Sequence, residues 1–315
     1  MRLAVLGAGA VGRSVAELAA EYGHTVTALA DSRGAVADAD GVDVAAALER
    51  KAEAGSVGDA APDDALAAEY DVLVEATPTT LGDAEPGFGH ARAALERDRH
   101  VVLANKGPVA ERYGDLRALE RESAGEIRFE ATVGGAILAL STIDDVGPSK
   151  VTAAHGVLNG TANFILSRMA AEGIGYEHVL AEAQDLGVAE ADPAFDVDGT
   201  DAALKCVILA NVLSDDDTEF SLDDAAVEGI RDVPGSALEL AAEDGRTVRL
   251  IGEASAEGVR VGPRLVPANG TLAVTGTRNI VQLETRHAGR LNISGRGAGG
   301  PETATAVLAD VGRLE

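Results

Sequence analysis

The sequence contains a single cysteine, no tryptophan and few aromatic residues, which make up 3% of its 315 positions. One cysteine, Cys206, excludes an intrachain disulfide and any metal site built from several cysteines. No run of 18 apolar residues occurs, and the N-terminal "MRLAVLGAGAVG" reaches its glycines too early to form the apolar region of a signal peptide. We therefore expect a soluble, cytoplasmic protein.

Basic residues are scarce as well, because 26 of them stand against 52 acidic residues and give a formal net charge of −26. The acidic residues are spread along the chain, so the protein repels the phosphates of nucleic acids and anionic membranes, and neither is an expected partner. Together with the low aromatic content, this balance is typical of a salt-adapted cytoplasmic protein. The length is sufficient for two domains with substantial cores.

Lysine is the rarer of the two basic residues, with four positions, Lys51, Lys106, Lys150 and Lys205, among the 26. Arginine serves wherever a permanent cation is enough, whereas a lysine ammonium is compact and can give up a proton. Each of the four lysines is therefore a candidate for a reactive site. The alternative is that a lysine occupies its position by chance and has no such role.

The first 31 residues carry a dinucleotide-binding pattern. Apolar residues 3–6 predict a buried strand, and a helical segment and a second strand ending at Asp31 follow. Between the first strand and the helix stand Gly7, Gly9 and Gly12, in the spacing G-x-G-x-x-G. Gly7 permits a tight turn, Gly9 lets a pyrophosphate approach the backbone, and Gly12 allows the helix to pack closely. The alternative is a glycine-rich turn that binds nothing.

The preference between NAD and NADP stays open at this stage. Asp31 would accept hydrogen bonds from the ribose hydroxyls and repel a 2′-phosphate, which favours NAD. Arg33 follows two residues later, and Lys51 ends a predicted helix, so these two cations could instead hold the 2′-phosphate.

Two further strands end in polar segments. "YDVLVEATPTT" (70–80) predicts a strand that runs into a turn at Pro78. "ARAALERDRHVVLANKGPVA" (91–110) predicts a helix, a strand and then a loop that carries Asn105 and Lys106. Because ligands bind at the carboxyl ends of strands in open α/β sheets, we expect Lys106 at a reacting position, with a plain surface lysine as the alternative.

The segment 155–173 predicts a strand, a Gly-Thr turn and an amphipathic helix, and 247–267 alternates like a β-hairpin. Thr161 lies near the start of that helix, where backbone N–H groups favour a carboxylate. A simple helix cap is the competing interpretation of Thr161.

Lys205 stands in a segment that otherwise has the composition of a protein core. Asp201 and Lys205 are four residues apart, on one face of a predicted helix that runs to about Leu213 and is apolar nearly all round, which indicates burial. A buried lysine needs a partner, and Asp201 is the nearest one. Glu190 and Asp196 could converge on it from the preceding loop, while a purely structural ion pair is the alternative.

At this point the chain resembles homoserine dehydrogenase, over nearly all of its length. The matching segments follow the family's order: "GAGAVG" (7–12), "EATPT" (75–79), "ANKGP" (104–108), "EATVGGAI" (130–137), "NGTANFIL" (159–166), "AEADPAFDVDGTDAALK" (189–205) and "GRGAGGPETATAVLAD" (295–310). Leu138 and Arg296 depart from the family, since each stands where proline is usual. Neither removes a catalytic group, although Arg296 could alter contacts to the nicotinamide or its phosphates.

The resemblance implies an α/β fold with a Rossmann-type parallel-sheet nucleotide-binding domain, residues 1–133 and 295–315, and an α+β catalytic and dimerisation domain, residues 134–294. It implies NAD(P)-dependent interconversion of L-homoserine and L-aspartate 4-semialdehyde, in threonine, methionine and isoleucine biosynthesis, by a homodimer. No segment for a regulatory domain follows, so threonine feedback through such a module is not expected.

The resemblance also assigns roles to residues. Hydride addition to the aldehyde creates an alkoxide, which needs an adjacent cation and proton donor. Lys205, held by Asp201, is the expected proton donor or acceptor and Lys106 assists it, although the sequence leaves open which lysine moves the proton. Glu190 and Asp196 would accept the substrate ammonium, and its carboxylate would bind at Gly160 and Thr161.

Two sets of ligand contacts follow from the same resemblance. The expected cofactor contacts are Gly7, Gly9, Ala10, Val11, Gly12, Asp31, Arg33, Lys51, Thr77, Lys106 and Gly300. The expected ligands of a structural monovalent cation, Na⁺ or K⁺, are Glu130, Val133, Gly135 and Ile137. Two other functions remain as alternatives, an amino-acid dehydrogenase that acts on aspartate and a dinucleotide sensor without catalysis.

Overall fold

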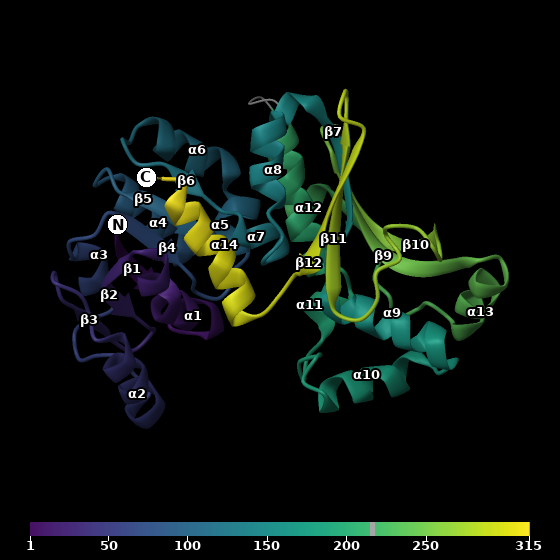
Figure 1. The fold of residues 1–315 in the computed structure, drawn as a ribbon, viewed down its shortest axis with the longest axis horizontal. Helices are drawn as coiled ribbons and strands as arrows, with labels where there is room; N and C mark the ends of the chain where they lie inside the picture. Colours follow the sequence, from purple (N-terminus) through teal and green to yellow (C-terminus); the bar gives the residue numbers. More distant parts are fainter. Residues whose placement is uncertain (215–217, 315) are drawn as a thin grey trace. The chain divides into compact units, whose positions relative to one another are not determined.

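The computed structural model describes residues 1–214 and 218–314, and the chain divides into two compact units (Figure 1). Unit 1 comprises Met1–Ala136 and Ala298–Glu315, and unit 2 comprises Ile137–Gly297. Each unit is built on one six-stranded sheet with helices packed on it, which confirms the predicted α/β class. In the described part of the chain, no helix is both long enough and apolar enough to cross a membrane.

The sheet of unit 1 has the strand order β3-β2-β1-β4-β5-β6 and is parallel except between β2 and β3. Its strands are β1 (Arg2–Leu6), β2 (Thr25–Ala30), β3 (Ala35–Ala37), β4 (Val72–Glu75), β5 (His100–Leu103) and β6 (Ile127–Arg128). The chain proceeds from β1 to β2 on one side and then crosses to β4 on the other. The order therefore reverses between β1 and β4, the switch point at which Rossmann-type sheets bind ligands.

The helices of unit 1 either connect these strands or follow the last of them. They are α1 (Ala10–Leu18), η1 (Ala19–Tyr22), α2 (Val44–Ala54), α3 (Asp64–Ala67), α4 (Gly87–Leu95), α5 (Lys106–Glu111), α6 (Tyr113–Arg121), α7 (Ala131–Gly134) and, from the end of the chain, α14 (Gly300–Gly312). Helix α14 packs on α1 although the two are almost 300 residues apart. Gly300 makes this close approach possible, because a Cβ there would lie 2.7 Å from the Ala10 carbonyl oxygen and the Ser14 Oγ.

The segment after β5 differs from the expected loop. Asn105 is the N-cap of α5 and accepts a hydrogen bond from the Gly107 N–H at 2.9 Å, so Lys106 is the first residue of a short helix. An asparagine at this position satisfies one of the amide groups that a helix start leaves without a partner, and the sequence prediction did not use this signal.

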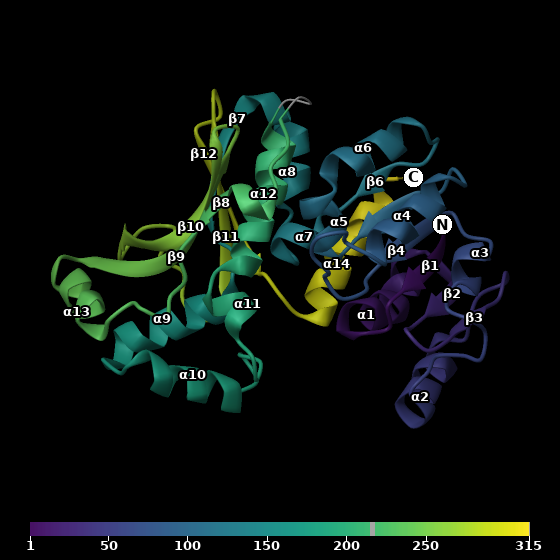
Figure 2. The same cartoon turned by 180° about the vertical axis from the view of Figure 1, so that it is seen from behind.

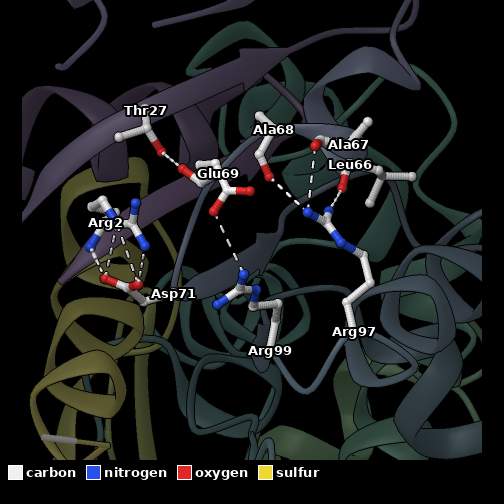
Figure 3. A network of polar contacts seen from close by, with 9 residues as sticks. All are labelled: Arg2, Thr27, Leu66, Ala67, Ala68, Glu69, Asp71, Arg97 and Arg99. Atoms are coloured by element: carbon white, nitrogen blue, oxygen red, sulfur yellow. Dashed lines mark hydrogen bonds and ion pairs between the residues drawn. The ribbon is translucent and has the colours of Figure 1, made fainter. Parts of the chain in front are cut away.

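Arginines form hydrogen bonds and ion pairs at the amino ends of β1, β4 and β5 (Figure 3). Arg2 opens β1 and pairs with Asp71, just before β4, at 2.8 Å. Arg97 donates to the carbonyls of three successive residues at the end of α3, and Arg99 lies 3.6 Å from the Glu69 carboxylate. These contacts lie at the amino ends of the strands, so they leave the carboxyl ends free for a ligand.

The sheet of unit 2 has the order β12-β11-β7-β9-β10-β8 and is antiparallel except between β10 and β8. Its strands are β7 (Val151–Val157), β8 (Ala225–Val227), β9 (Arg246–Ser255), β10 (Gly258–Pro267), β11 (Arg278–Thr285) and β12 (Arg290–Arg296). Strands β9 and β10 pair along their whole length, which confirms the predicted hairpin over 247–267.

The helices of unit 2 are α8 (Ala139–Val146), η2 (Pro148–Lys150), α9 (Gly160–Glu172), α10 (Tyr176–Asp185), α11 (Ala194–Val197), α12 (Thr200–Leu213), η3 (Leu222–Asp224) and α13 (Gly235–Glu243) (Figure 2). Helices α9, α12 and α13 pack on the sheet, and α10 packs on α9. Helix α12 contacts β7, β9 and β10, and all its residues except Thr200 and Val212 are buried. The predicted buried helix that contains Lys205 is therefore confirmed.

Candidate functional site

A cavity of about 820 Å³ opens in unit 1 beside the carboxyl ends of β1, β2, β4 and β5, and we call it the cofactor pocket. Its volume suits a ligand the size of a dinucleotide, and it lies at the switch point of the sheet. The predicted cofactor residues that line it are Gly7, Gly9, Ala10, Val11, Asp31, Lys51, Thr77 and Lys106. Gly12, Arg33 and Gly300 lie outside its lining.

Glycine is needed for a different structural reason at each of the three positions of the first turn. Gly7 has a φ of +96°, and a Cβ there would overlap the Ala76 carbonyl oxygen, so two neighbouring strand ends approach closely at this point. A Cβ on Gly12 would overlap the carbonyl oxygen of Gly7. Gly9 differs, because a Cβ there would meet no atom within 4 Å. The space over Gly9, at the start of α1, is open for a phosphate that binds the helix N-terminus.

Donors within the protein occupy the hydrogen-bond acceptor positions of the Asp31 carboxylate. Its Oδ1 accepts from the N–H groups of Arg33 at 2.8 Å and Gly34 at 3.0 Å. Its Oδ2 accepts from Lys51 Nζ at 2.7 Å and from the Val57 N–H at 3.1 Å. Burial by itself would raise the pKa of Asp31, but the Lys51 ammonium and the backbone donors lower it below its usual value. Because a carboxylate offers about four acceptor positions, protein donors occupy the lone pairs that the sequence prediction assigned to the ribose.

Two cations lie where α2 ends. Lys51 is in the last turn of α2, and its side chain is 32% exposed while it pairs with Asp31. The Arg33 guanidinium lies against Gly55, the residue that caps α2, where an added Cβ would overlap Nη1. Asp31 pairs with Lys51 and Arg33 adds a further cation near the end of α2, so the three side chains together carry a net positive charge.

The ends of β4 and β5 are joined by a buried polar cluster. Glu75 accepts hydrogen bonds from Thr77 and Asn105, and His90 Nδ1 lies 3.6 Å from Glu75 Oε2. Thr77, His90 and Lys106 line the cofactor pocket. The sequence prediction included Thr77 and Lys106 but missed Glu75, His90 and the linking role of Asn105.

Lys205 is buried in unit 2 within a set of hydrogen bonds that we call the Lys205 network. Lys205 Nζ donates to Asp201 Oδ2 at 2.7 Å and to the Leu158 carbonyl at 2.6 Å. Asn159 Nδ2 donates to the same Asp201 oxygen at 2.9 Å and to Asp196 Oδ1 at 2.6 Å. Asp201 and Lys205 are each 7% exposed, so the predicted ion pair forms away from solvent. The network presents an ammonium beside carboxylates, which suits proton transfer and the binding of a cationic group.

Two asparagines of this region are absent from the sequence-based site. Asn159 is the N-cap of α9, because its Oδ1 accepts from the Ala162 N–H at 2.8 Å while its amide group reaches the network. Asn279 donates from Nδ2 to the Leu158 carbonyl at 3.0 Å, the oxygen that also accepts from Lys205. An asparagine directly before a helical pattern is a recognised capping signal, so Asn159 could have been found, whereas Asn279 carries no local signal.

The remaining predicted substrate residues fall into two groups. Gly160 opens α9, and the Thr161 hydroxyl donates to the Val188 carbonyl at 3.1 Å, so Thr161 ties the acidic loop to the helix while Asn159 provides the cap. Glu190 is exposed, and among the described residues no hydrogen bond links its carboxylate to the Lys205 network. The structure brings together Asp196, Asp201 and Lys205 but leaves the side chain of Glu190 outside.

The predicted cation ligands are split between the units, because Glu130, Val133 and Gly135 belong to unit 1 and Ile137 to unit 2. Glu130 is 2% exposed, and its backbone N–H donates to Asp310 Oδ2 at 2.7 Å. Burial, with a further contribution from the Glu130 charge, raises the pKa of Asp310 to about 6. Within residues 1–214 and 218–314, no group of three or more His, Cys, Asp or Glu side chains could hold a metal ion.

Comparison with known proteins identifies relatives along the whole chain. The family model for homoserine dehydrogenase matches residues 140–311, and a model for glutamate, leucine, phenylalanine and valine dehydrogenases matches residues 1–80. A homoserine dehydrogenase from Methanocaldococcus jannaschii is 36% identical over 99% of this chain and 97% of its own length. An NAD⁺-dependent homoserine dehydrogenase from Pseudomonas canavaninivorans is 35% identical over 98% of this chain and 95% of its own length.

Solved structures show the same relationship. A candidate homoserine dehydrogenase from Archaeoglobus fulgidus superposes with a TM-score of 0.92 at 39% identity, over 100% of this chain and 99% of that one. A hyperthermophilic archaeal homoserine dehydrogenase in complex with NADPH gives a TM-score of 0.86 at 27% identity, over 99% of this chain and 97% of that one.

Proposed function

This chain belongs to the homoserine dehydrogenase family, and we propose that Lys205 is its proton donor and acceptor in the NAD(P)-dependent interconversion of L-homoserine and L-aspartate 4-semialdehyde. The chain is an oxidoreductase, and the family implies a place in threonine, methionine and isoleucine biosynthesis. The observation that carries the assignment is the burial of Lys205, whose ammonium is held by Asp201 and the Leu158 carbonyl. Stability alone would not require an ion pair at this place, since apolar residues of similar volume often serve equally well.

The reaction requires a proton to follow a hydride. A nicotinamide held in the cofactor pocket would supply the hydride for the aldehyde carbon, and its oxidised form would accept the hydride from the alcohol carbon in the opposite direction. As charge develops on the substrate oxygen, the Lys205 ammonium stabilises it and transfers a proton to it. Asp201 and the Leu158 carbonyl accept hydrogen bonds from Nζ and so orient it. In the oxidising direction neutral Lys205 accepts the proton from the alcohol. Lys106 supports the reaction through substrate binding and charge.

The amino-acid end of the substrate carries two opposite charges. Asp196 and Glu190 are proposed to accept the ammonium group, and Asp196 is already aligned by the Asn159 amide. Gly160 and Thr161, at the start of the 13-residue helix α9, are proposed to bind the carboxylate, because helix N-terminal N–H groups favour an anion. This arrangement would select a zwitterionic amino acid over a simple aldehyde.

The cofactor pocket is proposed to hold NADP in preference to NAD. The support is the state of Asp31, whose charge is offset by Lys51 and whose oxygens are occupied by protein donors. A carboxylate in this state repels a 2′-phosphate only weakly, and Arg33, which is exposed and whose guanidinium lies against Gly55, adds a second cation near the end of α2. The remaining proposed cofactor contacts are Gly7, Gly9, Ala10, Val11, Gly12, Thr77, Lys106 and Gly300.

Several broader features extend the proposal. Residues 1–133 and 295–315 would form the nucleotide-binding domain, and residues 134–294 the catalytic domain and the interface of a homodimer in the cytoplasm.

The proposed ligands of a structural Na⁺ or K⁺ are the Glu130 carboxylate and the carbonyls of Val133, Gly135 and Ile137. This donor set is all oxygen, which suits a hard cation, and a cation there would offset the buried charge of Glu130. The net charge of −26 supports adaptation to high salt.

The test is a substrate and cofactor profile in molar potassium chloride at alkaline pH. Homoserine should reduce NADP, and NAD more slowly, while aspartate should give no turnover. Lys51→Ala should lower kcat/KM for NADP at least tenfold, as expected for the loss of a charged contact to phosphate, and leave NAD turnover within about twofold. Turnover of aspartate without turnover of homoserine would contradict the assignment. Binding of cofactor without any turnover would favour a sensor.

A further inference from the structure

Glu75 is a fully buried carboxylate at the carboxyl end of β4, and none of its surface reaches solvent. Its Oε1 accepts hydrogen bonds from both the N–H and the hydroxyl of Thr77, the first at 3.1 Å. The same oxygen accepts from Asn105 Nδ2 at 3.3 Å, and Asn105 itself is 1% exposed. Three donors therefore converge on one carboxylate oxygen from two loops that are about 30 residues apart in the sequence.

These donors belong to both loops at the end of the cofactor pocket beside β4 and β5. Thr77 follows β4 and lines the pocket, as does Lys106, which follows β5. Asn105 links the two, because Nδ2 also lies 3.2 Å from Thr77 Oγ1 and 3.3 Å from the Pro78 carbonyl, while Oδ1 caps α5. The position of Lys106, the first residue of α5, consequently depends on the same asparagine that Glu75 holds.

The other carboxylate oxygen, Oε2, lies near His90, a residue that lines the pocket. His90 Nδ1 lies 3.6 Å from it, too far for a hydrogen bond, and neither atom has a hydrogen-bond partner among the described residues. A Cβ on Gly87 would come within 2.6 Å of Asn105 Nδ2 and 3.4 Å of Glu75 Oε1, so the start of α4 packs directly on the cluster. Burying a carboxylate in this way is costly, and fold stability alone does not account for it.

We propose that Glu75 is a positioning residue of the cofactor site, which holds Thr77 against the cofactor and, through Asn105, fixes the start of α5 and the position of Lys106. The inference rests on the proposed binding of NAD(P) in this pocket. Glu75 touches neither the cofactor nor the substrate, because it does not line the pocket, and it acts through the residues that do.

The first test measures cofactor binding separately from turnover. Binding of NADPH and NADH to Glu75→Ala and Glu75→Gln is titrated through cofactor fluorescence. Losing a hydrogen-bonded carboxylate that orders two contact loops should weaken binding about tenfold to a hundredfold in Glu75→Ala. Glu75→Gln keeps an acceptor oxygen with two lone pairs, so it should recover part of this loss. The KM for cofactor should rise more than the KM for homoserine, and kcat should fall because Lys106 is displaced.

A matched control is Asp71→Asn, which removes a carboxylate of unit 1 from the opposite edge of the sheet (Figure 3). It should lower the melting temperature without changing cofactor affinity. If Glu75→Ala folds and binds NADPH as tightly as the unmodified protein, the positioning role is wrong. If the unmodified protein itself binds neither cofactor, the proposed function fails instead, and the two failures are therefore distinguishable.

A double-mutant cycle covers the case in which Glu75→Ala does not fold. Thr77→Val removes the hydroxyl donor and keeps the shape of the side chain, and it is combined with Glu75→Gln. Because the two groups act together, the fold-changes in NADPH affinity should be clearly less than multiplicative. Multiplicative effects would show that Thr77 binds independently of Glu75 and would overturn the proposal.

Discussion

At the scale of single residues, the chemistry of this protein depends on buried charges and on the donors around them. Lys205, Asp31 and Glu75 all lie in polar surroundings that leave little of their surface exposed, at 7%, 7% and 0%. Each carries several hydrogen bonds, so each has a defined orientation rather than merely a compensated charge. The proposed reactive amine of Lys205, the Asp31 carboxylate that holds Lys51 and the proposed positioning carboxylate of Glu75 are therefore each oriented by contacts within one unit.

Acid should weaken the fold through Asp71. A hydrogen bond from Arg2 is the main reason that the pKa of Asp71 lies below its usual value, although partial burial opposes the shift. Because the folded-state pKa is depressed, the pair stabilises the protein above the unfolded-state pKa and loses this effect as the pH falls through the folded-state value. Asp71→Asn should lower the melting temperature at pH 7 by no more than about 4 °C, since the pair is partly exposed.

The measurement is the melting temperature of both proteins as a function of pH. The difference between them should narrow below about pH 4, where the carboxylate is protonated in the unfolded chain and then in the folded protein. A difference that stayed constant through this range would show that the pair contributes through packing and not through its charge.

At the scale of elements, sequence reasoning works where the constraint is local. The turn between β1 and α1 needs glycine for steric reasons that involve adjacent residues, and the helix from Asp201 to Leu213 is marked by its apolar composition. The contacts around Glu75 and Asn159 are different, because they join residues about 30 and about 40 positions apart. No periodicity records such contacts, so the link from Asn159 to Asp201 could not be predicted, although its capping role could, and Glu75 was missed altogether.

Asp31 was predicted as a site residue, but its contacts with residues distant in the sequence were not. Its position at the end of β2 was predictable from its distance to the glycines. The sequence could not show that four protein donors would occupy its oxygens. One donor comes from Lys51 and another from Val57, on segments that only the fold brings near Asp31. Asp31 holds Lys51 in the structure, and its role as a ribose acceptor stays a prediction.

The glycine turn provides a paired prediction. Gly9→Ala should fold normally, because the added Cβ meets no atom within 4 Å and the backbone there is extended, but it should weaken NADPH binding at least tenfold by blocking the phosphate. Gly12→Ala should instead destabilise the protein by about 1–3 kcal/mol, because its Cβ overlaps the Gly7 carbonyl. Thermal melting and cofactor titration of both variants separate the two effects. Equal losses of stability would contradict this division of roles.

At the scale of the whole molecule, the two units carry different parts of the chemistry. Unit 1 contains the cofactor pocket, and unit 2 contains the Lys205 network. Both share a chain with a net charge of −26, and self-repulsion of this size opposes compaction. The surface charge says nothing of the reaction, but it defines the conditions under which the reaction should be measured.

Salt should accordingly stabilise the protein. Raising potassium chloride from 0.1 M to 1 M shortens the screening length from about 10 Å to about 3 Å, so the melting temperature should rise by several degrees. Choline chloride at the same ionic strength is the control, because its cation is too large for an oxygen-lined site near Glu130. Equal effects of both salts would indicate screening alone, and a larger effect of potassium would support a bound cation. A melting temperature that fell with either salt would contradict the account.

The most direct measurement of the central claim is the homoserine-dependent reduction of NADP by Lys205→Ala, with Lys150→Ala as the matched control. Lys150 is an exposed lysine in η2 of the same unit. The account predicts that Lys205→Ala folds, binds NADPH as the unmodified protein does and loses about 10²–10⁴-fold in kcat, while Lys150→Ala retains full activity. A Lys205→Ala protein that oxidised homoserine within about threefold of the normal rate would contradict the assignment and leave Lys205 as a structural partner of Asp201.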